Sequence, residues 1–180
     1  LQASLREYQL QGFDWASRLA HWGAGACLAD DMGLGKTLQA LALLLARAKD
    51  GPSLVIAPTS VCFNWQQEAK KFAPTLNLHI FSDTAAGEAR QALLSGLGPF
   101  DCMIISYGLL QRESELLQQF TDLNEENAVE LVSKITSEMQ FIRGANKRRA
   151  LMIKINPGFQ TIFQVDTRTS ELTIIVNGIN

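Results

Sequence analysis

A glycine-rich turn at residues 30–37 constrains the fold more than any other stretch. It reads Asp-Asp-Met-Gly-Leu-Gly-Lys-Thr, and it lies between a short apolar run at 26–29 and a Leu- and Ala-rich segment at 38–47. Strand, loop and helix in this order are the context that a phosphate-binding loop requires. Gly33 and Gly35 let the backbone curl so that its N–H groups approach phosphate oxygens, and a helix N-terminus favours an anion. The sequence therefore predicts a nucleotide-phosphate site.

The two residues after the second glycine complete this interpretation. Lys36 is expected to reach the outer phosphates as a point charge, and the hydroxyl of Thr37 is expected to help hold Mg²⁺. The strict pattern has glycine where Asp30 stands, and an ordinary helix-capping turn is the alternative that so short a match leaves open. The flanking strand and helix favour nucleotide phosphate.

Composition limits the class of protein. The chain has 180 residues, of which 47% are apolar and 19% charged, a balance that suits one core or one lobe with a small appendage. Because the net charge is −2, any nucleic-acid site must be a local feature. Cys27, Cys62 and Cys102 lie in or beside apolar runs and are expected to be small buried side chains in a reducing compartment. No run has membrane-spanning length or resembles a signal peptide, so no membrane contact is expected.

Three apolar runs alternate with segments of helical pattern. The runs at 53–57, 76–81 and 101–106 predict strands, and Ser60 is expected to cap a helix that ends near Phe72. This alternation is typical of a parallel, doubly wound α/β sheet, in which binding loops follow the carboxyl ends of the strands.

An amphipathic helix is predicted ahead of the phosphate loop. The pattern taken by itself favours a plain docking helix. Its expected apolar side consists of Leu5, Tyr8, Phe13, Trp15 and Leu19.

Four segments together resemble the Swi/Snf-type ATPases of helicase superfamily two. They are Leu-Arg-x-Tyr-Gln-x-x-Gly-x-x-Trp at 5–15, the octet at 30–37, Ala-Pro-Thr-Ser with Asn-Trp at 57–65, and Ile-Ser-Tyr-Gly-Leu-Leu at 105–110. In that family an acidic pair precedes Met-Gly-Leu-Gly-Lys-Thr, which accounts for the missing glycine. The resemblance covers about residues 1–118. It implies the first part of a RecA-like lobe from a DNA-dependent ATPase.

The resemblance also implies a role for each matching residue. Gln9 would read adenine, because a carboxamide donates to and accepts from the adenine edge at once, and Arg6 would be a weaker neighbour. Hydroxyl and N–H groups at two helix starts would contact the backbone of duplex DNA. ATP and Mg²⁺ would be held by Asp30, Asp31, Met32, Gly33, Leu34, Gly35, Lys36 and Thr37, and DNA would be contacted by Thr59, Ser60, Ser106 and Tyr107.

One motif of the family has no clear counterpart. The family's lobe continues with an apolar strand that ends in Asp-Glu, where the aspartate holds Mg²⁺ through water and the glutamate orients the attacking water. Asp166 ends an apolar run, but Thr167 and Arg168 follow it, and an aspartate in this position is common for other reasons. The second lobe, with its arginine finger, is also absent. We therefore expect negligible ATP hydrolysis by this chain on its own.

The sequence changes in style after about residue 118. We expect two parts: an incomplete ATP-binding lobe at 1–118 and an unassigned α+β tail at 119–180. The tail is either a divergent insertion or the product of a junction between unrelated coding segments, and we favour the second. On either account the parallel sheet is expected to be short with exposed edges, and both chain ends are expected to be truncated. Within the tail the pattern predicts a helix at 124–143 and a β-meander with strands at 151–155, 159–166 and 172–176.

Three functions remain open from the sequence. The leading one is the ATP-binding segment of a DNA-dependent ATPase or translocase, located in the nucleus or with the bacterial nucleoid in the cytoplasm. The second is a non-catalytic module in which ATP is a structural or switching ligand. The third is a fragment whose tail binds a protein partner.

Overall fold

The computed structural model of the chain describes residues 1–22, 26–28, 33–118, 149–156, 159–166, 171–172 and 175–177. The helix predicted at 124–143 lies outside these residues. Where the chain is described, no helix is long and apolar enough to cross a membrane.

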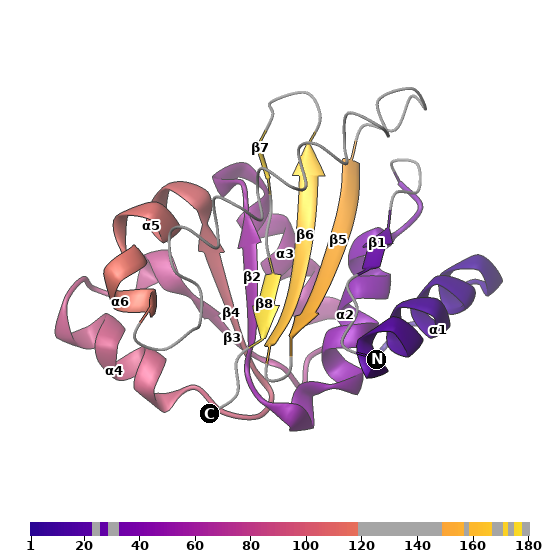
Figure 1. Cartoon of the computed structure of the whole chain (residues 1–180), viewed down its shortest axis with the longest axis horizontal. Coiled ribbons are helices and arrows are strands. Elements are labelled where there is room, and N and C mark those ends of the chain that lie inside the picture. Colours follow the sequence, from indigo (N-terminus) through magenta and orange to yellow (C-terminus); the bar gives the residue numbers. More distant parts are fainter. Residues whose placement is uncertain are drawn as a thin grey trace.

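One twisted sheet forms the centre of the described structure (Figure 1). Its main path runs in the order β1-β5-β6-β2-β4-β3, with β7 paired to β6 and β8 paired to β2. The described strands are β1 (Ala26–Leu28), β2 (Ser53–Ala57), β3 (Asn77–Ile80), β4 (Asp101–Ser106), β5 (Arg149–Asn156), β6 (Phe159–Asp166), β7 (Glu171–Leu172) and β8 (Ile175–Asn177).

The parallel sheet predicted from the first two-thirds of the sequence is confirmed. β2 pairs in parallel with β4, Val55 opposite Ile104, and β4 pairs in parallel with β3. β1 runs in the same direction, because it is antiparallel to β5 and β5 is antiparallel to β6, which is parallel to β2. The carboxyl ends of β1, β2 and β4 therefore share one edge, where binding loops are expected.

The strands after residue 148 join this sheet rather than forming one of their own. β5 and β6 form an antiparallel hairpin that lies between β1 and β2. The antiparallel pairing expected of a meander is present between β5 and β6. The parallel sheet, which we expected to be short with exposed edges, is instead extended, because the hairpin pairs with both β1 and β2.

Five of the six described helices lie in two groups, and α3 packs on both α2 and β4 (Figure 1). α1 packs on α2, and both lie toward β1 and β5, whereas α4 to α6 gather beside β3 and β4. The helices are α1 (Glu7–His21), α2 (Lys36–Ala46), α3 (Thr59–Phe72), α4 (Glu88–Gly96), α5 (Tyr107–Arg112) and α6 (Ser114–Gln118), with short 3-10 turns at Ala48–Asp50 and Phe81–Asp83.

The buried side of α1 differs from the predicted one. Its buried residues are Gln9, Ala16 and Ala20, with Phe13 and Leu19, both predicted on the apolar side, partly buried beside them. The rings of Tyr8 and Trp15, which we expected on the apolar side, are 37% and 39% exposed. Small residues form the stripe because α1 approaches α2 closely, and the large aromatic rings are left at its flanks.

The start of α3 also corrects a prediction. The cap position is Pro58, and Thr59 and Ser60 are the first two residues of the helix, so Ser60 is not its cap. Proline before the first turn suits this place because its fixed φ is compatible with helix entry. The predicted end of this helix at Phe72 is confirmed.

The side chains of Cys62 and Cys102 are described, and both are free thiols, with Cys102 buried and Cys62 partly buried. Burial raises the pKa of the Cys102 thiol to about 12 and that of the Cys62 thiol to about 11. Both thiols therefore stay protonated near neutral pH, and neither is suited to be a nucleophile or a metal ligand.

Candidate functional site

The phosphate loop has the backbone that its glycines predict. Gly33 and Gly35 have positive φ values of 87° and 71°, a region that residues with a side chain rarely adopt. α2 begins directly afterwards, at Lys36. The carboxyl end of β1, the two glycines and the first turn of α2 thus form the predicted strand, loop and helix. The remaining loop residues Asp30, Asp31 and Met32 lie outside the described structure.

Helix α1 is hydrogen-bonded to this loop through one carbonyl group. The Leu34 carbonyl oxygen accepts hydrogen bonds from Gln9 Nε2 at 3.0 Å and from the Tyr8 hydroxyl at 3.2 Å. Gln9 Oε1 in turn accepts the backbone N–H of Arg6 at 2.9 Å. Gln9 therefore touches the loop directly, whereas Arg6 contributes its main chain at this point.

Two features favour glycine at position 35: its positive φ and the closeness of the Gln9 side chain. A Cβ atom at Gly35 would lie under 3.0 Å from Gln9 Nε2, closer than packed side chains approach. A side chain at this position would therefore displace the end of the Gln9 carboxamide from its place beside Leu34. This glycine makes room for the carboxamide.

Lys36 and Thr37 occupy the first two positions of α2, where backbone N–H groups lack partners within the helix. Lys36 is 8% exposed, so most of its side chain lies against the protein rather than in solvent. Thr37 is half-buried. In the described part of the chain no cluster of three or more His, Cys, Asp or Glu residues is placed to hold a metal ion.

A hollow of about 280 Å³ lies near the ends of β2 and β4. Two of the predicted nucleic-acid residues, Thr59 and Ser106, line it, and Ser60 lies exposed beside Thr59. The side chain of Tyr107 is outside the described structure. Among the described lining residues there is an acid, Asp83, and no Lys or Arg.

Asp166 lies at the same edge of the sheet, although its side chain is not described. β6 is parallel to β2, with Phe163 opposite Ile56, and Asp166 is its last residue. Its backbone is thus near the level at which α3 begins after β2. The sequence could not predict this, because pairing between β6 and β2 depends on residues a hundred positions apart.

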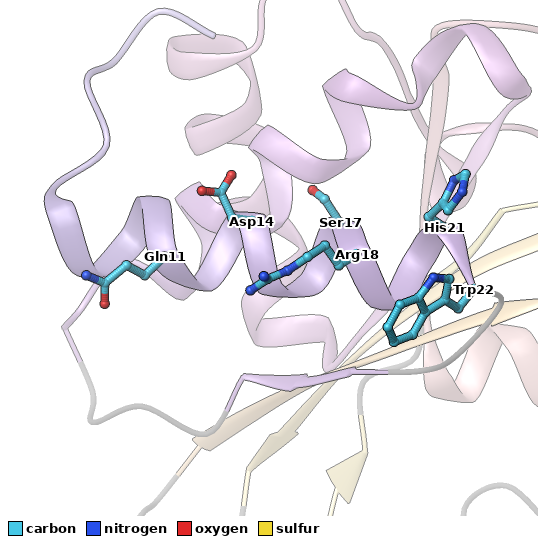
Figure 2. Close-up of a pocket in the computed structure, with 6 residues that line it drawn as sticks. All are labelled: Gln11, Asp14, Ser17, Arg18, His21 and Trp22. Atoms are coloured by element: carbon cyan, nitrogen blue, oxygen red, sulfur yellow. The ribbon is translucent and has the colours of Figure 1, made fainter.

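A further hollow, of about 550 Å³, runs along the outer side of α1 (Figure 2). At 100° per residue, most of its lining residues lie about 120–180° around the helix from Gln9, and Ser17 lies at about 80°, so the hollow as a whole does not face the phosphate loop. They are Gln11, Asp14, Ser17, Arg18, His21 and Trp22.

Two contacts at the loop were missed from the sequence. Tyr8 was assigned to the apolar side of α1, and its hydroxyl instead bonds to Leu34. Gln39 follows the loop by one helical turn, and its buried carboxamide lies against Gly12 of α1. Helical periodicity assigns polar residues to the solvent side, so it does not predict such contacts.

Other proteins contain segments that are similar in sequence to this chain. A family profile described as the SNF2-related domain matches residues 8–131. The chain is 35% identical over 173 residues to the chromatin-remodeling ATPase INO80 of Mycosarcoma maydis, covering 87% of this chain and 9% of that protein. It is 42% identical over 126 residues to the putative ATP-dependent helicase/translocase YwqA of Bacillus subtilis, covering 67% of this chain and 13% of that protein.

The fold has a counterpart among solved structures. The Sulfolobus solfataricus SWI2/SNF2 ATPase core in complex with dsDNA aligns with a TM-score of 0.54 and 42% identity, over 64% of this chain and 24% of that one. The chain spans about a tenth of the length of the curated relatives it matches. The matched region contains α1, the phosphate loop and the parallel strands β2, β3 and β4. The chain therefore belongs to the SNF2-related family of ATPase domains.

Proposed function

We propose that this chain is the ATP-binding segment of a DNA-dependent ATPase that translocates on duplex DNA. The observation that carries the proposal is the hydrogen bond between Gln9 and the phosphate loop at Leu34. It holds a carboxamide, which suits an adenine edge, at a fixed place beside the loop that suits phosphates. A single nucleotide can then contact the carboxamide through its adenine ring and the loop through its phosphates.

The hydrogen-bonding capacity of Gln9 supports adenine recognition. A carboxamide has two N–H donors and an oxygen with two lone pairs. One donor is used on Leu34 and one lone pair on the N–H of Arg6. One donor and one lone pair remain, which is what a ring nitrogen and the amino group of adenine need. The hydrogen bonds within the chain thus orient the Gln9 carboxamide and leave one donor and one lone pair for adenine.

The loop residues fit the phosphates and their ion. The positive φ at Gly33 and Gly35 turns the backbone toward the start of α2, whose N–H groups favour an anion. Lys36 adds a positive charge for the outer phosphates, and the hydroxyl of Thr37 is a ligand for Mg²⁺. When bound, ATP with Mg²⁺ supplies the phosphoanhydride bond that the family cleaves. Asp30, Asp31 and Met32 complete the proposed nucleotide site, with Arg6 at its margin.

The proposed DNA contacts lie at the ends of β2 and β4. Thr59, Ser60 and Ser106 present hydroxyl groups there, and the first N–H groups of α3 are free of helix partners. Tyr107 is the fourth proposed contact. Uncharged donors of this kind position a backbone without adding salt dependence.

The setting of the parent protein follows from the same proposal. A duplex-DNA partner implies a nuclear location or a bacterial cytoplasm, and two relatives named above are a chromatin-remodeling ATPase and a bacterial helicase/translocase. A protein partner for residues 119–180 stays a prediction.

Equilibrium binding of a fluorescent ATP analogue with Mg²⁺ tests the proposal directly. The full chain is compared with Lys36→Ala and, as a matched control, with Lys49→Ala, an exposed lysine after α2. We expect binding by the wild type and Lys49→Ala, and a loss of at least about ten-fold in Lys36→Ala, the size expected for one charge-assisted contact. Equal binding by all three chains, or by none, would overturn the proposal.

A further inference from the structure

Two glutamine–glycine contacts join α1 to the phosphate loop and α2. Gln9 of α1 lies against Gly35 of the loop, and Gln39 of α2 lies against Gly12 of α1. In both cases a Cβ on the glycine would lie under 3.0 Å from the end of the glutamine side chain. Each of the two segments thus supplies one glutamine and one glycine.

The two contacts are one helical turn apart on both segments. Gln9 and Gly12 are separated by three residues on α1 and therefore share a face. Gly35 and Gln39 are separated by four residues, and the N–H of Gln39 donates to the Gly35 carbonyl at 3.2 Å in the first turn of α2. Because α1 packs on α2 and Gly35 directly precedes α2, a change in the separation at Gly12 and Gln39 is expected to change the separation at Gln9 and Gly35.

Gln39 is an unusual residue to find at this place. Its side chain is 2% exposed, and neither its Oε1 nor its Nε2 has a hydrogen-bond partner. A buried carboxamide without partners disfavours the folded state, and an apolar side chain of equal length would fill the same space without that cost. The property that matters for the contact with Gly12 is therefore the length of this side chain, which fills the space next to the glycine.

We propose that Gly12 and Gln39 are positioning residues that set the place of the Gln9 carboxamide and thereby the preference of this site for adenine nucleotides. The proposal rests on the adenine-reading role proposed above for Gln9. It assigns no contact with nucleotide to Gly12 or Gln39 themselves.

A methyl group at Gly12 would act through Gln39. The carboxamide end of Gln39 is flexible in principle, but it is packed on all sides, so it cannot simply swing into solvent. We expect α1 to move away from α2 instead, which draws Gln9 away from Leu34. Phosphate binding by the loop would persist, because Lys36 and the start of α2 are unchanged.

The selectivity for ATP over GTP distinguishes a positioning role of Gly12 and Gln39 from a purely structural one. Dissociation constants are measured for fluorescent ATP and GTP analogues with Mg²⁺, using the full chain and the variants Gly12→Ala, Gln39→Ala and the double variant. Gly96→Ala is the matched control, because it adds a methyl group at the end of α4 where nothing lies within 4 Å. Thermal unfolding of each variant checks that it is folded.

We expect each single variant to lower the ratio of ATP affinity to GTP affinity by about five- to ten-fold, the range of one or two lost hydrogen bonds. The double variant should recover most of the ratio, because the new methyl group occupies space that Gln39 has vacated. Gln39→Met, which keeps the length without the polar atoms, should retain the wild-type ratio. If Gly12→Ala fails to fold, Gln39→Ala and Gln39→Met decide the question.

The failure of this inference is distinguishable from failure of the proposed function. If Gln9→Ala lowers the ratio while Gly12→Ala and Gln39→Ala do not, the positioning role is overturned and the proposed function stands. A uniform loss of ATP and GTP affinity in the glycine or glutamine variants also overturns it, since that indicates a structural role. If Gln9→Ala itself leaves the ratio unchanged, both proposals fall together.

Discussion

Gln9 Nε2 donates a hydrogen bond of 3.0 Å to the carbonyl oxygen of Leu34, and so joins the first helix to the phosphate loop. The glutamine is 6% exposed, whereas Tyr8 and Trp15 on the same helix are 37% and 39% exposed. A polar residue is thus buried where the apolar pattern would place a ring. The reason is a specific contact rather than general packing.

Gln9→Ala is therefore expected to weaken ATP binding by about ten-fold, since one contact with adenine and the orienting contact with Leu34 are both lost. Gln11→Ala is the matched control, because Gln11 is an exposed glutamine on the opposite side of the same helix. Titration of a fluorescent ATP analogue measures both. Equal effects of the two substitutions would contradict the role of Gln9.

The full chain is expected to turn over ATP negligibly, with or without duplex DNA. The family's Asp-Glu pair positions the water that attacks the terminal phosphate, and Asp166 is followed here by Thr167 and Arg168. Phosphate release measured under saturating Mg²⁺ and ATP should stay at the level of Lys36→Ala. Asp166→Asn should leave nucleotide affinity unchanged. DNA-stimulated turnover that disappears in Lys36→Ala would show this expectation to be wrong.

Local pattern predicted the parallel part of the fold well. The strand at 53–57 is apolar after Ser53 and lies between two parallel neighbours, so burial on both faces and sequence pattern agree. The glycines of the loop were equally informative, because a positive φ leaves few alternatives to Gly33 and Gly35. In these segments the local preference and the tertiary contacts favour the same structure.

Long-range pairing was not predictable in the same way. The hairpin of β5 and β6 reads locally as part of a meander, and only its pairing with β1 and β2 makes it part of the central sheet. Likewise Tyr8 and Gln39 gain their roles from residues more than twenty positions away. Periodicity describes which face of a helix is apolar, and it does not identify a polar contact made across that face.

His79 Nε2 and Asp101 Oδ1, which are 2.9 Å apart, predict a pH dependence of stability. Burial by itself would raise the pKa of the Asp101 carboxyl, but hydrogen bonds from His79, the Gly98 N–H and Asn77, with the charge of His79, lower it below its usual value of 3.8. A carboxyl whose pKa is lowered by folding stabilises the fold at pH above the unfolded value. That contribution is lost as the pH falls through the folded value.

Asp101→Asn should therefore be destabilised relative to wild type at pH 6, and the difference should shrink as the pH falls below about 4. Urea unfolding across this range measures it, with Asp14→Asn, at an exposed position on α1, as a control for removing one negative charge. A difference between wild type and Asp101→Asn that is independent of pH would contradict the role of this carboxylate.

The ion pair between Arg90 and Glu113 ties α4 to the turn between α5 and α6. Its side chains are only 10% and 22% exposed. Arg90 also donates to the Thr84 carbonyl at 3.2 Å and lies 4.9 Å from the centre of the Phe81 ring. Removal of the carboxylate alone leaves a guanidinium group that is largely withdrawn from water and has lost its counter-charge.

Glu113→Ala is expected to lower the free energy of unfolding by about 1–3 kcal/mol, less than for a fully buried pair because the contacts with Thr84 and Phe81 remain. Asp50→Ala is the matched control: it breaks the more exposed pair with Arg47 and should cost well under about 1 kcal/mol. Arg90→Met combined with Glu113→Ala should cost less than the sum of the two single changes, because no unpaired charge is left behind. Urea unfolding of the four variants at neutral pH measures these differences. Strict additivity of the double variant would show that the two side chains do not interact energetically.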